Sequence, residues 1–160
     1  MSEPDAQHKT VNENGEEIQQ HAFLDDDELT KLYNFVKRHS ADSTFDKTVY
    51  SVIDRHGMQP PDVYKNAMMR RQDFSRVTEI GNTSVTRRMA WQIIIGLHCD
   101  MDEADEVLFS AGYIRRKSAF DLTMEYFIKH RNYDIMAINE VLYELGIKVF
   151  SCHKPVSDNK

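Results

Sequence analysis

The residues best suited to binding a charged partner are concentrated between Asp54 and Arg88. This stretch holds seven Lys or Arg and four Asp or Glu, a net charge of +3, whereas residues 1–30 carry −8. Because cationic side chains bind phosphate groups, the stretch permits a nucleic-acid-binding face, although its modest charge does not demand one. The cationic residues are Arg55, Lys65, Arg70, Arg71, Arg76, Arg87 and Arg88.

Two pairs of potential metal ligands, His98-Cys99 and Cys152-His153, lack the spacing of a chelating site. Adjacent residues of a helix point about 100° apart, and no zinc-type spacing is present. A buried cysteine that behaves as a small apolar residue is the better interpretation. We therefore predict no metal and no other cofactor.

Catalytic motifs are also missing from the sequence. It contains no GxSxG, HExxH, Walker or glycine-rich phosphate motif. Glu103, Asp105 and Glu106 crowd the first turn of a predicted helix, where the helix dipole stabilises acids without any chemistry. We predict a protein that is not an enzyme.

The composition bounds the class of protein. Hydrophobic residues make up 41% and charged residues 29% of the 160 residues, which is typical of a globular chain with one core and an appendage. The two cysteines form no disulfide framework, and we find neither a secretory signal pattern nor an apolar run long enough to span a membrane. These features predict a cytoplasmic protein.

The segment Asn82–Cys99 is predicted to form a buried central helix that organises the rest of the chain. Its apolar residues cover most of the helix circumference. Asn82, Thr83 and Ser84 can each cap its first turn. The remaining polar residues fall on one narrow polar strip: Ser84, Arg87, Arg88 and Gln92.

Periodicity elsewhere predicts seven or eight helices and no strand, which makes the fold all-α. Phe74, Val77 and Ile80 are expected to face inward from a helix that Gly81 ends. Ser118 and Asp121 have the spacing of a capping box. The other helices are expected within residues 23–39, 45–56, 60–67, 100–111, 118–130 and 134–145.

The first of these helices is amphipathic. Four of its residues are spaced as one apolar stripe, which comprises Leu29, Leu32, Tyr33 and Val36. Two roles stay open for this stripe. It packs on the main domain, or it binds a partner or a second copy of the chain.

The helix order within Phe45–Gly112 resembles the Cro/C1-type, lambda repressor-like helix-turn-helix domain. The matching residues are DVYKNAMMRRQDFSRV, for its second and third helices, and TRRMAWQIIIGLHCDMDEADEVLFSAGY, for its fourth and fifth. The run Ala67-Met68-Met69 occupies the turn where many family members have Gly. Ser118–Phe150 resembles the helical extension of degenerate helix-turn-helix domains at the C-termini of some bacterial multidomain proteins.

This resemblance implies a compact multi-helix bundle of lambda repressor-like type, with an N-terminal helix and two extra C-terminal helices. We divide the chain into a disordered acidic and polar tail (1–21), an N-terminal amphipathic helix with its linker (22–44), the helix-turn-helix-like domain (45–112), a helical extension (113–150) and a flexible tail (151–160).

The resemblance also implies that the third helix enters the major groove of double-stranded DNA. Arg and Gln can each match two base atoms at once, whereas contacts to phosphate position the protein without reading sequence. The expected base contacts are Arg71, Gln72, Ser75 and Arg76. The expected phosphate contacts are Lys65, Arg70, Arg87 and Arg88.

The first functional hypothesis is a bacterial or phage transcriptional regulator that binds DNA, as a dimer by the family resemblance. The alternative is an adaptor or inhibitor that uses the same fold to contact a protein. The acidic first 30 residues and the absence of Gly from the turn favour this alternative. A DNA reader should present its arginines without acidic neighbours, whereas an adaptor should expose an apolar patch there or on the apolar stripe.

Overall fold

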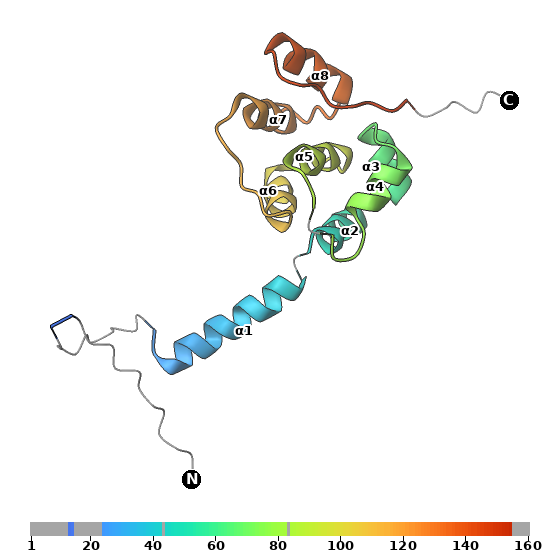
Figure 1. The fold of residues 1–160 in the computed structure, drawn as a ribbon. Coiled ribbons are helices and arrows are strands. Elements are labelled where there is room, and N and C mark those ends of the chain that lie inside the picture. The colour runs from blue at the N-terminus through green and yellow to red at the C-terminus, as the bar shows by residue number, and fades with distance from the viewer. Residues whose placement is uncertain (1–12, 15–23, 43, 83, 155–160) are drawn as a thin grey trace. The chain divides into compact units, whose positions relative to one another are not determined.

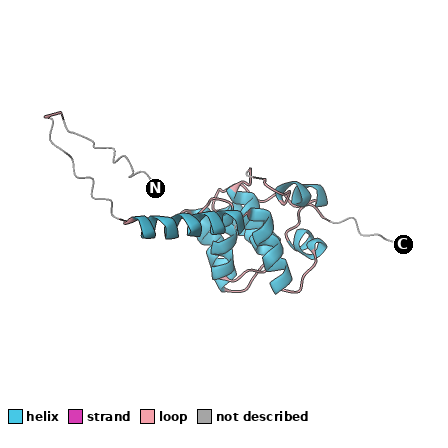
Figure 2. Ribbon diagram, turned by 90° about the horizontal axis from the view of Figure 1, so that it is seen from below, coloured by secondary structure: helices cyan, strands magenta, loops and turns pink. Residues whose placement is uncertain are grey.

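A computed structural model of the chain describes residues 13–14, 24–42, 44–82 and 84–154. Within these residues the secondary structure consists of eight α-helices without a strand, which confirms the all-α prediction (Figure 2). No helix in the described part of the chain is long and apolar enough to cross a membrane. The helices are α1 (Asp26–Asp42), α2 (Phe45–Arg55), α3 (Pro60–Asn66), α4 (Arg71–Val77), α5 (Arg87–Gly96), α6 (Met101–Ser110), α7 (Ala119–Lys129) and α8 (Ile135–Glu144).

The chain divides into two compact units, Met1–His39 and Ser40–Lys160. In the first unit, Asp25 and Glu28 cap the start of α1 reciprocally. The Asp25 N–H donates to Glu28 Oε2 at 3.0 Å, and the Glu28 N–H donates to Asp25 Oδ1 at 2.8 Å. The predicted tail over residues 1–21 lies outside the described residues, apart from residues 13–14.

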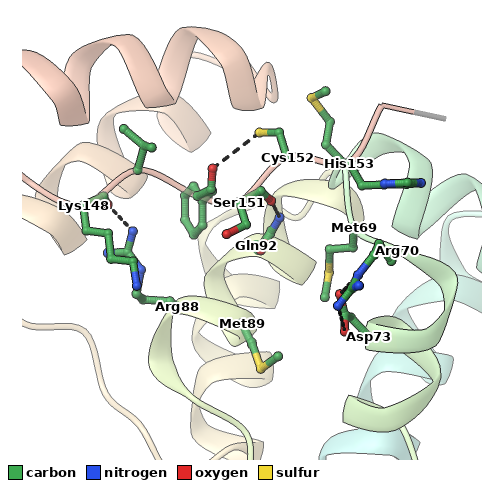
Figure 3. A pocket seen from close by; sticks show the side chains of 13 residues that line it. Met69, Arg70, Asp73, Arg88, Met89, Gln92, Lys148, Ser151, Cys152 and His153 are labelled. Carbon is green, nitrogen blue, oxygen red and sulfur yellow. Dashed lines mark hydrogen bonds and ion pairs between the residues drawn. The ribbon is translucent and has the colours of Figure 1, made fainter. Parts of the chain in front are cut away.

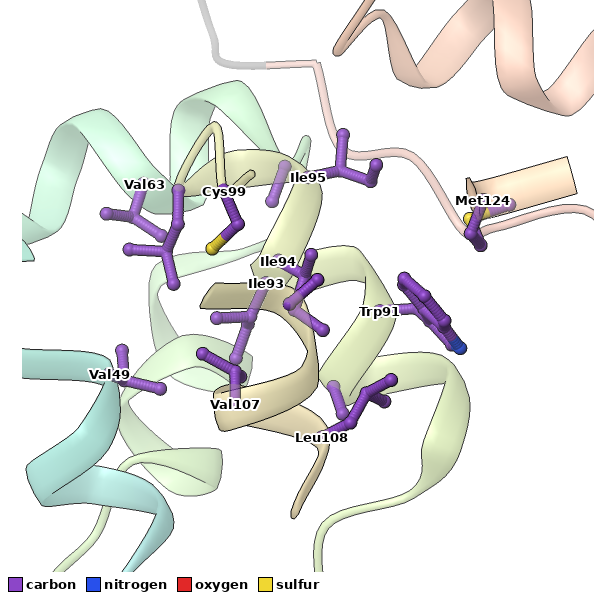
Figure 4. Close-up of a cluster of buried hydrophobic side chains, with 14 of the residues drawn as sticks. Val49, Val63, Trp91, Ile93, Ile94, Ile95, Cys99, Val107, Leu108 and Met124 are labelled. Atoms are coloured by element: carbon purple, nitrogen blue, oxygen red, sulfur yellow. The ribbon is translucent and has the colours of Figure 1, made fainter. Parts of the chain in front are cut away.

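The second unit is organised around α5, which packs against both α3 and α6 (Figure 1). Trp91, Ile93, Ile94 and Ile95 are fully buried, so the predicted central position of this helix is confirmed. Figure 4 shows these side chains gathered with apolar residues of the neighbouring helices. α2 packs on α6, and α7 packs on both α6 and α8, which completes the bundle.

The central helix is shorter than predicted, because it begins at Arg87 rather than in the run that starts at Asn82. Its N-cap is Thr86, whose hydroxyl accepts a bond from the Met89 N–H at 3.2 Å. Asn82 instead closes the loop after α4, since its side-chain amide donates to the Arg76 carbonyl at 2.8 Å. Thr83, another expected cap, lies outside the described residues.

Gly96 sets the distance between α5 and α3. A Cβ atom at this position would lie 2.5 Å from the Val63 carbonyl oxygen and 2.8 Å from Ala67 Cβ. Only glycine therefore permits the observed approach of the two backbones. The Asn66 side chain crosses the same contact and donates to the Gly96 carbonyl at 3.2 Å.

The connection from α3 to α4 is a tight turn in which Met68 adopts a left-handed conformation, with φ of +53°. This conformation favours glycine, and Met68 adopts it within the run Ala67-Met68-Met69, which contains no Gly. The Met69 N–H donates back to the Tyr64 carbonyl at 2.8 Å, which fixes the direction in which α4 leaves the turn.

The inward face of α4 differs in part from the prediction. Phe74 and Val77 are buried as expected, but the Ile80 side chain is 94% exposed. The prediction for Ile80 was wrong because α4 ends at Val77. Beyond Thr78, the chain no longer follows the helical period that would return position 80 to the core.

Candidate nucleic-acid interface

The four predicted base contacts lie together on the outward face of α4. Arg71, Gln72, Ser75 and Arg76 are all exposed, whereas Phe74 and Val77 on the other face are buried. The helix therefore presents two guanidinium groups, one amide and one hydroxyl to solvent. This arrangement is compatible with contacts to base edges, which remain a prediction.

The acidic neighbour of this face, Asp73, is paired with Arg70. Arg70 Nε donates to Asp73 Oδ2 at 2.8 Å and Nη2 donates to Oδ1 at 3.1 Å. These hydrogen bonds hold the pKa of the Asp73 carboxyl below its usual value and raise the pKa of Arg70. The pair is locally neutral, so Asp73 repels a phosphate less than its isolated charge would. Lys65, on α3, is exposed.

Arg87, an expected phosphate contact, binds inside the domain. Its Nη1 lies 2.9 Å from Asp121 Oδ2 and donates to the Ile114 carbonyl at 2.9 Å. The guanidinium also lies over the Tyr113 ring, 4.9 Å from its centroid. Because the Arg87 side chain is largely buried, it holds the start of the helical extension against α5.

Asp121 is the buried centre of this arrangement, with only 1% of the residue exposed. Besides Arg87, it accepts bonds from the Trp91 indole N–H at 3.1 Å and from the Arg116 backbone N–H at 2.7 Å. The Asp121 N–H donates to Ser118 Oγ at 3.2 Å, which is one of the two bonds of the predicted capping box. The second bond, from the Ser118 N–H to the carboxylate, is not formed, because the carboxylate binds the other three donors. The sequence did not predict the role of the carboxylate, although a buried tryptophan needs an acceptor for its N–H.

Arg88, the second expected phosphate contact on α5, is also held internally. Its guanidinium lies 4.8 Å from the Phe120 ring centroid and 5.2 Å from that of Phe150, and it donates to the Lys148 carbonyl. Burial lowers the pKa of Arg88. Its observed contacts thus join α5 to the extension, while its contact with phosphate remains a prediction.

The chain after α8 crosses the start of α5 and reaches the α3–α4 turn. We call residues 148–154 the C-terminal strap. Gln92 Nε2 donates both to the Ala67 carbonyl at 2.8 Å and to the Ser151 carbonyl at 3.2 Å. The His153 N–H donates to the Met68 carbonyl at 2.7 Å. A pocket of about 480 Å³ lies between the strap and the first turns of α4 and α5 (Figure 3).

The strap is anchored a second time by Asn139 of α8. The Phe150 N–H donates to Asn139 Oδ1 at 2.8 Å, and Asn139 Nδ2 donates to the Phe150 carbonyl at 3.0 Å. Within the predicted flexible tail (151–160), residues 151–154 are described, and Ser151, Cys152 and His153 form hydrogen bonds. Residues 155–160 lie outside the described part. The polar strip of α5 is therefore the surface on which the extension docks.

Apolar side chains are exposed in two places relevant to the alternative hypothesis. Within the first unit, the apolar stripe of α1 is between 47% and 66% exposed. Within the second unit, Phe109, Ile114 and Leu122 are exposed around a groove of about 870 Å³ beside α6 and α7. Exposed apolar patches of this kind are typical of protein-binding surfaces.

The two cysteines differ in accessibility, because Cys99 is buried and Cys152 is exposed on the strap. Burial raises the pKa of both thiols, and much more strongly for Cys99. We expect Ellman's reagent to titrate one thiol per native chain, slowly, and two after denaturation. In a Cys152→Ser variant the native chain should not react, and prompt reaction of that variant would contradict the burial of Cys99.

Comparison with known proteins places the chain in no family. No protein-family model matches the chain, and no curated protein or solved structure matches it significantly.

Proposed function

We propose that this protein is a cytoplasmic, non-enzymatic DNA-binding regulator of the lambda repressor-like helix-turn-helix type. The observation that carries the proposal is the outward face of α4, where Arg71, Gln72, Ser75 and Arg76 lie together on a helix that follows a tight turn. Of the two acidic residues near this face, Asp73 is paired with Arg70, and Glu79 is exposed. The forked side chains match the hydrogen-bonding edges of guanine and adenine in the major groove.

The internal bonds of Arg87 and Arg88 limit the strength of binding in this proposal. Both guanidinium groups hold the extension. The exposed cations close to the turn are then Lys65, Arg71, Arg76 and Arg70, the last of which is paired with Asp73. Few phosphate contacts imply a weak sequence-independent component and a shallow dependence on salt. Tight binding therefore requires a preferred sequence.

The test is a fluorescence-anisotropy titration against random duplex DNA at two salt concentrations, followed by selection of a preferred sequence. For that sequence we expect Arg71→Ala and Arg76→Ala each to weaken binding by about 1–3 kcal/mol. Lys129→Ala is the control, because this lysine pairs with Glu125 on α7. No binding at low salt, both for the full chain and after removal of residues 1–30, would contradict the proposal.

A protein-interaction adaptor is the second candidate, and the groove beside α6 and α7 favours it. Phe109 and Ile114 are exposed there although both are large and apolar. In this candidate the Arg87–Asp121 pair has a purely structural role. The test is site-specific crosslinking from position 122 in host cells, with and without Phe109→Lys. A single crosslinked protein that disappears in the variant would support the adaptor, whereas an unchanged pattern would not.

A further inference from the structure

The apolar stripe of α1 requires a covering surface. Leu29, Leu32, Tyr33 and Val36 are 47%, 47%, 66% and 53% exposed, respectively, although all four share one side of the helix. A stripe of this spacing is typical of a helix that pairs with another helix. We propose that α1 pairs in antiparallel orientation with α1 of a second copy of this chain.

The charges of α1 select the orientation of this pair. Its first turn contains Asp26, Asp27 and Glu28, whereas Lys37 and Arg38 belong to its later half. An antiparallel pair brings the acidic turn of each copy beside the basic half of the other, but a parallel pair aligns like charges. Flanking charges of this kind determine orientation in paired helices.

The same orientation separates the two N-terminal segments. Residues 1–25, which precede α1, carry a net charge of −5, so two copies side by side would repel each other. In an antiparallel pair these segments leave from opposite ends of the paired helices. Salt screens the remaining repulsion at distances beyond about 10 Å.

The position of the stripe also suits an antiparallel pair. It runs from Leu29 to Val36, a rise of about 10 Å along the helix axis, and Leu32 and Tyr33 are its midpoint. Pairing about this midpoint places Leu29 of one copy level with Val36 of the other. Each copy contributes only four side chains, so the interface is small and we expect a weak dimer that depends on concentration.

The experiment measures the mass of the full chain by sedimentation across a range of concentrations. Leu32→Glu should raise the dissociation constant by about tenfold or more, which corresponds to about 1.4 kcal/mol. Asn34→Glu, which adds the same charge away from the stripe, should change it little. A monomer at every concentration, or a dimer insensitive to Leu32→Glu, would overturn the proposal.

Charge reversal tests the orientation separately. Asp26→Lys alone and Lys37→Asp alone should each weaken the dimer several-fold, and the double variant should restore it. In a parallel pair neither change brings opposite charges together, so absence of restoration would overturn the antiparallel arrangement. Far-ultraviolet circular dichroism of each variant verifies that α1 still forms. None of these results depends on DNA binding.

Discussion

Replacement of Asp121 by alanine should lower the free energy of unfolding by about 3–5 kcal/mol. The carboxylate is 1% exposed and accepts from Arg87, from the Trp91 indole and from the Arg116 backbone. Its removal leaves a largely buried guanidinium without its counter-charge and two N–H donors without an acceptor. Denaturation by urea, followed by tryptophan fluorescence, measures the loss at the site itself, because Trp91 is the single tryptophan of the chain.

Two companion variants identify the cause of that loss. Asp121→Asn keeps an acceptor oxygen but removes the charge, so it should recover only part of the stability. Asp102→Ala removes an exposed acid on α6 and should change stability by less than about 0.5 kcal/mol. If Asp121→Ala were as mild as Asp102→Ala, the buried ion pair would not stabilise the fold.

The second large effect is expected at Gly96. Glycine to alanine in a helix ordinarily gains about 1 kcal/mol. Here the added methyl would lie 2.5 Å from the Val63 carbonyl oxygen, which belongs to backbone and cannot rotate away. We therefore expect Gly96→Ala to destabilise the protein by about 1–3 kcal/mol, because α3 must move away from α5. The same urea titration measures this loss in the free energy of unfolding.

Glu140→Ala on α8 is the control for Gly96→Ala, since it also introduces alanine into a helix but at an exposed site. It should leave the unfolding midpoint nearly unchanged. Val63 and Ala67 belong to the α3–α4 region, so the displaced α3 should also change the amide chemical shifts of α4. A stable Gly96→Ala protein with unchanged α4 shifts would show that the two backbones can separate without cost.

The sequence predicted the helices well where hydrophobic periodicity alone determines which residues are buried. The burial of Ile93, Ile94 and Ile95 follows from a run that is apolar around the whole helix. The first residue of that helix could not be predicted from the sequence, because Asn82, Ser84 and Thr86 all have side chains that can cap a helix. Contacts elsewhere in the fold determine which of these residues is the N-cap. Asn82, for example, donates its side-chain amide to the Arg76 carbonyl.

The candidate interface was predictable only in part, because some of its residues have partners that are distant in the sequence. The exposure of Arg71 and Arg76 follows from local helical spacing. Arg87 and Arg88 were equally cationic in the sequence, but their partners lie 34 and 60 residues away. No local pattern reveals such pairs, so an arginine that stays exposed and one that reaches a buried aspartate look alike before folding.

The C-terminal strap has a consequence for the order in which the protein is completed during synthesis. The Gln92 side chain donates to the carbonyl of Ser151 in the strap, which lies 59 residues further along the chain. The Met68 carbonyl accepts from the N–H of His153, which is also in the strap. A nascent chain that ends after α6 has already made Arg87, Trp91 and Met68, but not the groups that satisfy them. Such a chain exposes unpaired polar groups that favour degradation. The bonds from the strap to Gln92 and to the Met68 carbonyl can therefore form only after residues 151–153 have been synthesised.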